Sequence, residues 1–311
     1  MKNTTTYKMR KLIALVAMLL IGFKGFAQQD PMLSHYMFNG LFLNPAYAGS
    51  HKYFGTSLIH RNQWMGFDGA PKTSVFAIDG PIKSKTMGVG LTFANDNIGK
   101  NSRNDILLNY AYHIGINKTS KLSFGISAGL VNVSRKTPFA WDANDQSLAP
   151  NSFWGPRAGF GMYYYSKKGY LGLSIPTLIG KEPSRAFDFN VEKSTFVKRH
   201  YLLTGGYLFD VGSNIILKPS FLLKYQQAAP LQADINLNAL FYETFWLGAS
   251  FRTGDAIVAL AEYQITRQLR IGASYDYSYT KLGRLTNGSF EVMIGYDFGK
   301  DPLKAKNPRY F

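Results

Sequence analysis

The side chains best suited to catalysis in this 311-residue chain are its histidines, but their spacing matches no catalytic motif. No histidine lies four residues from another, so no H-E-x-x-H zinc motif is present, nor is there a G-x-S-x-G nucleophile elbow or a Walker loop. The histidines are His35, His51, His60, His113 and His200. His113 and His200 lie in or beside predicted strands, where a structural hydrogen bond is a simpler role than catalysis at the rim of a barrel.

Cysteine and nucleotide-binding loops are also missing. The chain has no cysteine, which excludes a thiolate metal site, a disulfide framework and a cysteine nucleophile. The glycine pairs Gly88-x-Gly90 and Gly159-x-Gly161 lie inside strand-like segments, where glycine marks crowding or a bulge. We therefore predict no cofactor and no enzymatic activity.

Residues 1–27 have the three parts of a secretory signal peptide. Basic residues come first, an apolar run follows over 12–23, and Gly25-Phe26-Ala27 supplies a cleavage site. The run is too short to cross a hydrocarbon core of about 30 Å as a helix. We predict cleavage after Ala27 and export, and the missing cysteine excludes a lipoprotein.

The net charge of +16 includes five basic residues of the predicted signal peptide, so it overstates the charge of the exported part. Without the five basic residues of the signal peptide, 30 Lys and Arg remain against 19 Asp and Glu. These basic residues form no cluster and match no nucleic-acid motif, so we expect contact with anionic lipid headgroups or acidic partners and no nucleic acid.

The elements that carry these side chains alternate with period two. Phe290, Val292 and Ile294 share one face of the last segment, and Glu291 and Met293 share the other. Along the chain, the polar faces are rich in Gly, Ser, Asn and Asp, which suits a crowded or wet lumen better than the surface of a soluble sandwich. With 15% aromatic residues, this pattern predicts an all-β fold, an antiparallel transmembrane β-barrel of about 14 strands in an outer membrane.

The predicted strands occupy residues 52–298, and their connections alternate in length. The strands are 52–63, 72–80, 86–94, 104–115, 120–134, 156–166, 169–178, 199–210, 213–225, 231–241, 244–252, 255–265, 268–279 and 288–298. Connections after even strands are short, whereas those after odd strands include 95–103, 135–155, 179–198 and 280–287. Short turns face the periplasm in such barrels, and an even strand count places both barrel ends there. A barrel of about 14 strands has a lumen wider than side chains alone would fill, so the lumen is either a channel or filled by a plug.

Two segments lie outside the predicted barrel. Residues 28–51 are apolar over 32–43, so we expect them to form a periplasmic or plug segment that packs under or into the barrel, with Asn44-Pro45 making its final turn. Residues 299–311 form a basic C-terminal tail on the periplasmic side. Either segment would plug the barrel or bind a periplasmic partner, with a disordered terminus as the alternative.

Several sequence blocks resemble one known family. The first blocks carry Asp30, Pro31, Tyr36, Phe38 and Asn39, then Asn44, Pro45, Tyr47 and Gly49. Later blocks carry Arg61, Gln63 and Trp64, then Pro71, and the terminus carries Arg309. Together they resemble the PorP/SprF family of type IX secretion outer-membrane proteins from Bacteroidetes. We assign the first blocks to a partner-binding or plug segment and the later ones to a structural motif, with Trp64 at the membrane interface and Arg61 at a loop base.

The resemblance implies a role in export. It implies outer-membrane lipid, type IX secretion components and a secreted surface protein such as an adhesin as partners, and a link to gliding in some relatives. The alternative is a porin or fatty-acid-type transporter, which uses the same architecture. A lumen lined by charges of one sign would favour the transporter, but the inward candidates are of mixed sign (Lys218, Glu262, Arg270, Asp276 and Glu291).

Overall fold

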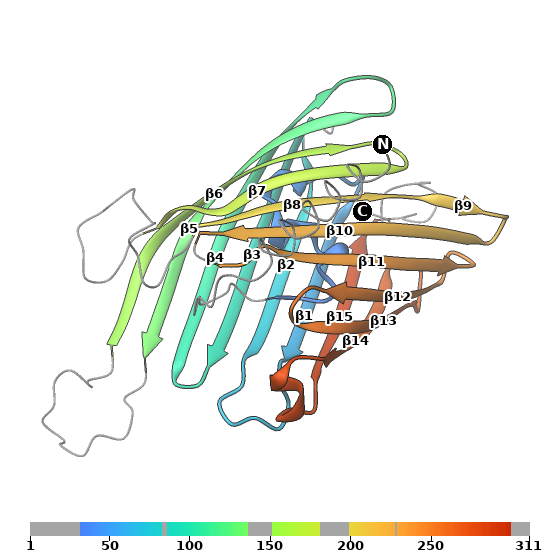
Figure 1. Cartoon of the computed structure of the whole chain (residues 1–311). Coiled ribbons are helices and arrows are strands. Elements are labelled where there is room, and N and C mark those ends of the chain that lie inside the picture. The colour runs from blue at the N-terminus through green and yellow to red at the C-terminus, as the bar shows by residue number, and fades with distance from the viewer. Residues whose placement is uncertain (1–31, 83–85, 136–150, 181–198, 228, 300–311) are drawn as a thin grey trace, which may run out of the picture.

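The computed structural model describes residues 32–82, 86–135, 151–180, 199–227 and 229–299, which form a closed antiparallel barrel around a short N-terminal segment (Figure 1). Strands pair in chain order around the sheet, and the last strand, β15 (Ser289–Phe298), pairs with the first, β1 (Phe54–Asn62), to close it. Closure leaves no unpaired sheet edge, which is the way a sheet satisfies its backbone groups in lipid. No helix in the described part of the chain is long and apolar enough to cross a membrane.

The first half of the barrel contains the longest strands. Its strands are β1 (Phe54–Asn62), β2 (Lys72–Ile82), β3 (Met87–Ile98), β4 (Asn101–Gly115), β5 (Lys121–Arg135), β6 (Asn151–Tyr165) and β7 (Gly169–Gly180).

The second half includes one interrupted strand. Its strands are β8 (His200–Tyr207), β9 (Phe209–Val211), β10 (Ile215–Gln226), β11 (Gln232–Phe241), β12 (Phe245–Arg252), β13 (Ala256–Gln264), β14 (Leu269–Ser278) and β15 (Ser289–Phe298). β8 and β9 are separated only by Leu208 and both pair with β10, so they act as one strand. The barrel therefore has 14 strands, as the sequence predicted.

The alternation in the sequence corresponds to the two faces of the wall. In β15, Phe290, Val292 and Ile294 are exposed on the outer surface, while Glu291 and Met293 are buried inside. Leu108, Ile126 and Ile235 belong to the same exposed apolar surface on other strands. A band of exposed aliphatic and aromatic side chains around a polar interior is the arrangement expected of a barrel in lipid.

The prediction of a connection over 95–103 is wrong. β3 continues to Ile98 and β4 begins at Asn101, so the turn is confined to Gly99 and Lys100, with Gly99 at φ +57°. The polar residues that favoured a loop hydrogen-bond across the hairpin instead, as Asn95 donates to Asn104 Oδ1 at 2.7 Å. Asn95 and Asn104 alternate with Asp96 and Asp105, which line a cavity in the lumen, so the two asparagines lie on the outer face. Their bond across the strands extends the hairpin where hydropathy alone indicates a loop.

Some aromatic residues near the strand ends face inward. Tyr163 and Tyr165 on β6 and Trp246 on β12 are buried, while Tyr164 between the two tyrosines is exposed. Clusters of aromatics at strand ends thus serve both faces of this wall.

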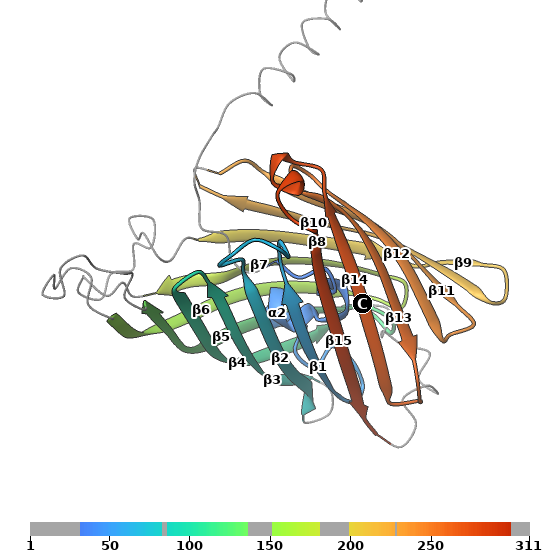
Figure 2. The same cartoon turned by 90° about the horizontal axis from the view of Figure 1, so that it is seen from below.

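The two ends of the barrel differ. At the short-turn end, the connections are 116–120, 166–168, 212–214, 242–244 and 265–268. At the long-loop end, the described connections include 63–71 and 279–288, and also the short turns 99–100 and 253–255. Figures 1 and 2 show the N-terminal segment, in blue, enclosed by the strands between these ends.

Candidate functional site: the filled lumen

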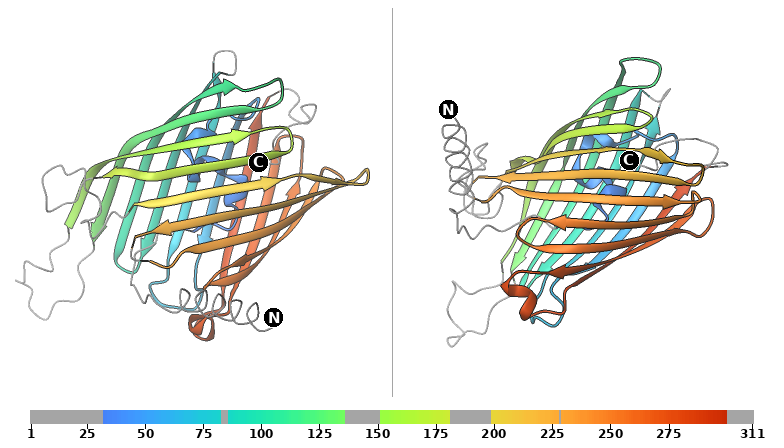
Figure 3. Two further views of the ribbon diagram at one scale, coloured as in Figure 1. Left: turned by 45° about the horizontal axis from the view of Figure 1, so that its top comes forward. Right: turned by 45° about the vertical axis from the view of Figure 1, so that its right-hand side comes forward.

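The residues before β1 form a compact chain of short helices inside the barrel. They comprise η1 (Tyr36–Phe38), α2 (Gly40–Leu43) and η2 (Pro45–Tyr47), seen through the wall in both views of Figure 3. We call residues 32–50 the lumen segment. Its apolar side chains are buried, with Leu33, Leu41, Ala46 and Ala48 each 3% exposed or less. The apolar composition of this segment predicted that it would be buried, and the barrel interior is where it is buried.

The turn at Asn44 and Pro45 has a local cause. Asn44 is extended at φ −146° and ψ 114°, the conformation that a following proline favours. Its side-chain oxygen accepts a hydrogen bond from the Ala46 amide at 2.9 Å, and Pro45 occupies the first position of η2. The amide nitrogen of Asn44 also donates to the Met162 carbonyl of β6 at 2.9 Å, which ties this turn to the wall.

Near the long-loop end, an acidic pair on the wall holds the lumen segment. The backbone amides of Ser34 and His35 donate to the two oxygens of Glu291 at 2.8 and 2.7 Å, and His35 Nδ1 lies 2.7 Å from Oε1. The Ser34 hydroxyl donates to Asp276 Oδ1 at 2.8 Å. Arg61 donates to Asp276 at 2.7 Å and to the Ser34 oxygen at 3.0 Å. Since Glu291 and Arg61 are also register partners on β15 and β1, this cluster spans the seam where the barrel closes.

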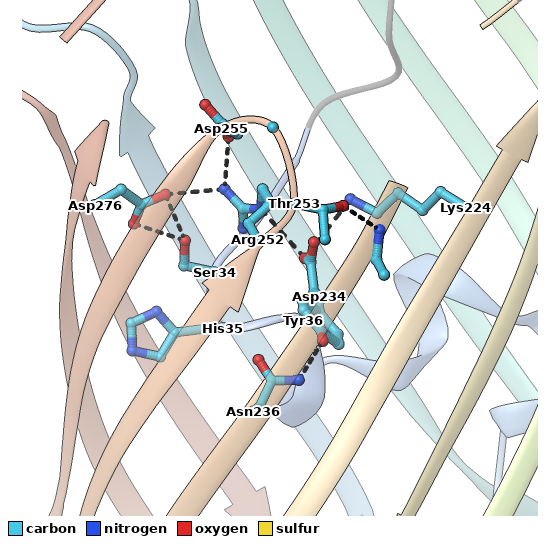
Figure 4. Close-up of polar contacts among 12 residues, drawn as sticks. Ser34, His35, Tyr36, Lys224, Asp234, Asn236, Arg252, Thr253, Asp255 and Asp276 are labelled. Atoms are coloured by element: carbon cyan, nitrogen blue, oxygen red, sulfur yellow. Dashed lines mark hydrogen bonds and ion pairs between the residues drawn. The ribbon is translucent and has the colours of Figure 1, made fainter. Parts of the chain in front are cut away.

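The cluster continues along the wall as a chain of opposite charges (Figure 4). Arg252 is 3.0 Å from Asp276, 3.2 Å from Asp234 and 3.3 Å from Asp255. Lys224 is 3.9 Å from Asp234. Charges buried to this degree are tolerated when each has an opposite partner and hydrogen bonds. The lumen charges are therefore mixed in sign and engaged with one another.

The middle of the segment is held by contacts of Tyr36, Met37 and Phe38. The Tyr36 phenol accepts a hydrogen bond from Asn236 at 2.6 Å, and burial, followed by nearby Asp234, raises its pKa well above the usual value, so the phenol stays neutral. Lys218 Nζ lies 3.4 Å from the Met37 carbonyl and 5.2 Å from the centre of the Phe38 ring, a cation–π distance. The Phe38 ring also packs edge-on against Trp246, with centroids 5.6 Å apart.

Toward the short-turn end, the segment's backbone bonds to the wall. His113 Nε2 donates to the Ala48 carbonyl at 2.9 Å, and its other nitrogen lies 3.1 Å from the Tyr165 hydroxyl. The Gly49 amide donates to Asp79 at 2.9 Å. His113 thus makes the lumen hydrogen bond expected of it.

Glycines on the wall let the lumen segment approach the strands. At Gly125 on β5, a Cβ atom would overlap the backbone of Pro45 and Ala46, and at Gly88 on β3 it would overlap the Ala48 carbonyl. Glycine in a strand commonly marks such an approach of another backbone.

We expect Gly125→Val to displace the turn at Pro45. Overpacking of this kind costs about 1–3 kcal/mol. The measurements are denaturant unfolding in detergent and single-channel conductance in planar bilayers, in which the variant should conduct more than the unaltered protein. Gly115→Val is the matched control, because nothing lies within 4 Å of a Cβ there. Equal behaviour of the two variants would contradict this close approach.

The residues assigned to the structural motif have different surroundings in the structure. Arg61 lies one residue before the end of β1, and its side chain is buried in the lumen cluster, so it serves more than a loop base. Gln63 and Pro71 close the 63–71 connection through a 2.9 Å backbone hydrogen bond. Trp64 has φ +50°, and its amide donates to Ser289 at 3.1 Å.

Of the segment's assigned residues, the structure brings Tyr36, Phe38, Asn39, Asn44, Pro45, Tyr47 and Gly49 into the lumen. Asp30, Pro31 and Arg309 lie outside the described residues. The sequence placed Asp276 and Glu291 on an inward face but did not connect them with the lumen segment.

A cavity remains on each side of the segment. The larger, at the long-loop end, holds about 1180 Å³ of space not filled by atoms, part of it open to solvent. Leu33, Leu41 and Phe42 contribute to its apolar lining, and Asp105, Arg157 and Lys224 to its polar lining. The smaller, of about 470 Å³, is lined by Asn39, Tyr47, Asp79 and Arg270, among others. Within the described residues, no group of three or more His, Asp or Glu side chains is placed to hold a metal ion.

These features define a class of protein, a membrane β-barrel of the outer-membrane type whose lumen is occupied by its own N-terminal segment. The fold is similar to that of the toluene transporter TbuX from Ralstonia pickettii, with a TM-score of 0.50 and 9% identity over 83% of this chain and 92% of that one. The outer membrane protein Omp33 from Acinetobacter baumannii gives 0.49 and 10% identity over 80% of this chain and 100% of that one. At such low identity, the likeness concerns the fold alone.

The chain belongs to the family described as type IX secretion system membrane protein PorP/SprF, whose sequence profile matches residues 25–296. No curated protein matches the chain. The family match agrees with the resemblance seen in the sequence blocks.

Proposed function

We propose that this chain is a scaffold of the type IX secretion system that supports the secretion or surface anchoring of a secreted partner such as an adhesin. The proposal assigns it no catalytic role and no cofactor. It expects other secretion components and outer-membrane lipid as further partners. The observation that supports it best is the occupied lumen, because a barrel filled by its own buried segment offers a rigid wall and surface loops rather than an open path.

The filling of the lumen also weighs against the porin alternative. Diffusion needs a continuous water-filled path, whereas residues 33–49 bond to strands on several sides of the barrel, including β15, β11, β6, β4 and β2. Selective uptake of an ionic solute favours a lumen with charge of one sign, yet the charges here are paired with opposite ones.

Affinity capture from the outer membrane tests the proposal. A tag inserted after Asp68, which is exposed in the 63–71 connection, is expected to recover a secreted surface protein or secretion components after gentle solubilisation and mass spectrometry. The same tag after Lys118, at the opposite end, is the matched control for access of the affinity resin. Recovery of the barrel alone from both positions, together with steady conductance in a planar bilayer, would replace the scaffold with the transporter.

A further inference from the structure

The outer face of β4 changes from apolar to polar before the strand reaches its end among the long loops. Every second residue from Ile106 to Ile114 is apolar or aromatic and exposed. These residues cover about 27 Å along the strand at about 3.4 Å a residue, which for a strand tilted by about 40° is most of an apolar band about 25 Å tall. Ser102 and Asn104 continue the same face beyond Ile106. The end of β4 therefore projects past the lipid.

Polar residues continue this surface on the neighbouring strands. The register pairs Asn104 with Asn95 of β3 and with Asn132 of β5, and it pairs Asn132 with Trp154 of β6. One row closer to the membrane, the register partners on β3, β4 and β5 are apolar and exposed (Phe93, Ile106 and Leu130). We call the five residues beyond this boundary the outer polar strip (Asn95, Asn97, Asn104, Asn132 and Trp154).

The amides of the outer polar strip are held in place by hydrogen bonds. Asn97 donates to Asn95 Oδ1 at 2.6 Å, and Asn95 donates to Asn104 Oδ1 at 2.7 Å. Asn132 donates to the Ser152 hydroxyl at 3.0 Å. An asparagine amide has two N–H donors and an oxygen that can accept two hydrogen bonds. These bonds therefore orient the side chains and leave part of their hydrogen-bonding capacity for a ligand.

Trp154 adds an aromatic face beside these amides. It is 55% exposed, and it lies in the row of Asn132 and Asn104 rather than among the apolar residues of the membrane band. The face of an aromatic ring carries partial negative charge, so it packs well against the C–H bonds of a sugar ring. Sugar hydroxyls both donate and accept hydrogen bonds, as amides do. An exposed indole next to a row of amides is therefore suited to a saccharide.

The composition of the outer polar strip also selects among ligands. No described side chain on this part of the outer face of β3–β6 is charged, whereas phosphate groups are bound by arginine and lysine. The centres of protein interfaces are enriched in aromatic residues, methionine and arginine, and only Trp154 of the strip belongs to that group. The strip faces sideways along the membrane, so its nearest neighbours are molecules of the outer leaflet.

From this placement we infer that the outer polar strip is a binding site for the core sugars of the outer-leaflet glycolipid. Long loops of such barrels lie outside the cell, so the strip is on the external side. The glycolipid of a bacterial outer membrane is lipopolysaccharide, whose sugars begin where its acyl chains end. Its acyl chains cover the apolar band, and its sugars pack on Trp154 and bond to the amides. The inference specifies the contact with outer-membrane lipid and does not depend on the proposed role in secretion.

Native mass spectrometry in detergent tests the inference. The purified protein is incubated with equal amounts of rough lipopolysaccharide and of lipid A made from it by mild acid hydrolysis, which removes the core sugars and keeps the acyl chains. Trp154→Ala removes the aromatic face. The double variant Asn95→Ala and Asn104→Ala removes both partners of one hydrogen bond. Tyr277→Ala is the matched control, because Tyr277 is 63% exposed near the same end of β14 and outside the strip.

We expect the unaltered protein and Tyr277→Ala to favour lipopolysaccharide over lipid A by about tenfold, the effect of one or two net hydrogen bonds. Both strip variants should bring this ratio close to one, while heat-modifiable gel mobility shows that their barrels are folded. Equal binding of the two glycolipids by the unaltered protein would overturn the inference and leave a protein as the partner of this face.

A preference that survives in either strip variant, or that is also lost in Tyr277→Ala, would overturn the inference as well. None of these outcomes bears on the capture experiment, so the inference and the proposed role in secretion can fail independently.

Discussion

Replacing Glu291 with alanine is expected to lower the free energy of unfolding by about 3–5 kcal/mol, the range seen when one partner of a buried charge cluster is removed. Glu291 is fully buried and accepts from two backbone amides and from the His35 ring, while Arg61 lies 3.4 Å from it. Alanine leaves these buried donors without their acceptor. Equilibrium unfolding in urea, followed by tryptophan fluorescence in detergent micelles, measures the change.

Two controls separate the cluster from the effect of charge alone. Glu291→Gln keeps an acceptor of the same shape, so its loss should be smaller than that of alanine. Asp210→Asn removes a carboxylate whose partner Lys168 is more than half exposed, and such surface pairs contribute little. If Glu291→Ala unfolds at the same urea concentration as Asp210→Asn, the cluster does not hold the lumen segment.

Arginine at Ile294 is expected to cost about 2–4 kcal/mol, because it places a charge on the lipid face near the middle of the membrane. Ile294 is half exposed, near the centre of β15, between the exposed apolar residues Leu58 and Ile271 on the neighbouring strands. Unfolding from lipid vesicles, read by heat-modifiable gel mobility, gives the loss relative to the unaltered protein.

The same substitution at a strand end serves as its control. Ile257 is equally exposed but is the second residue of β13, beside exposed Phe251 and Tyr277. Aromatics of this kind mark the membrane interface, where arginine costs about 0–1 kcal/mol. Equal losses at Ile257 and Ile294 would show that the lipid belt is placed wrongly along the strands.

The facing of the strands was predictable because it depends on local alternation. Ile294 and Glu291 point to opposite sides for the simple reason that side chains alternate along a strand. The sequence also identified Lys218, Glu262, Arg270, Asp276 and Glu291 as inward, and each is largely buried.

Alternation could not predict which side chains an inward residue contacts. The alternation placed Met293 on the inward face, but it did not show that an apolar cluster surrounds this residue. Met293 is 1% exposed and belongs to the same buried apolar cluster as Leu33 and Phe38. Its neighbours come from the lumen segment, more than 250 positions away in the chain, and no local pattern records that contact.

Arg61 illustrates the same limit at the candidate site. Its position near the end of a strand indicated a loop base, and the backbone position agrees. Its guanidinium, however, bonds to Asp276 and Ser34, and the three come from parts of the sequence that meet only in the closed barrel. Composition indicated that residues 32–43 would be buried, but only the complete wall determines where.

The contacts of Ser34 have a consequence for the order of folding. Ser34 and Glu291 are separated by 257 positions, and Glu291 lies on the strand that completes the ring against β1. Ser34 and His35 therefore wait for the last strand before their buried amides find an acceptor. Contacts of such long sequence separation form late, since the loop they close is costly in entropy. Closure of the β1–β15 seam and docking of Ser34 and His35 should therefore occur as one cooperative step. A closed barrel without the lumen segment in place should not be stable.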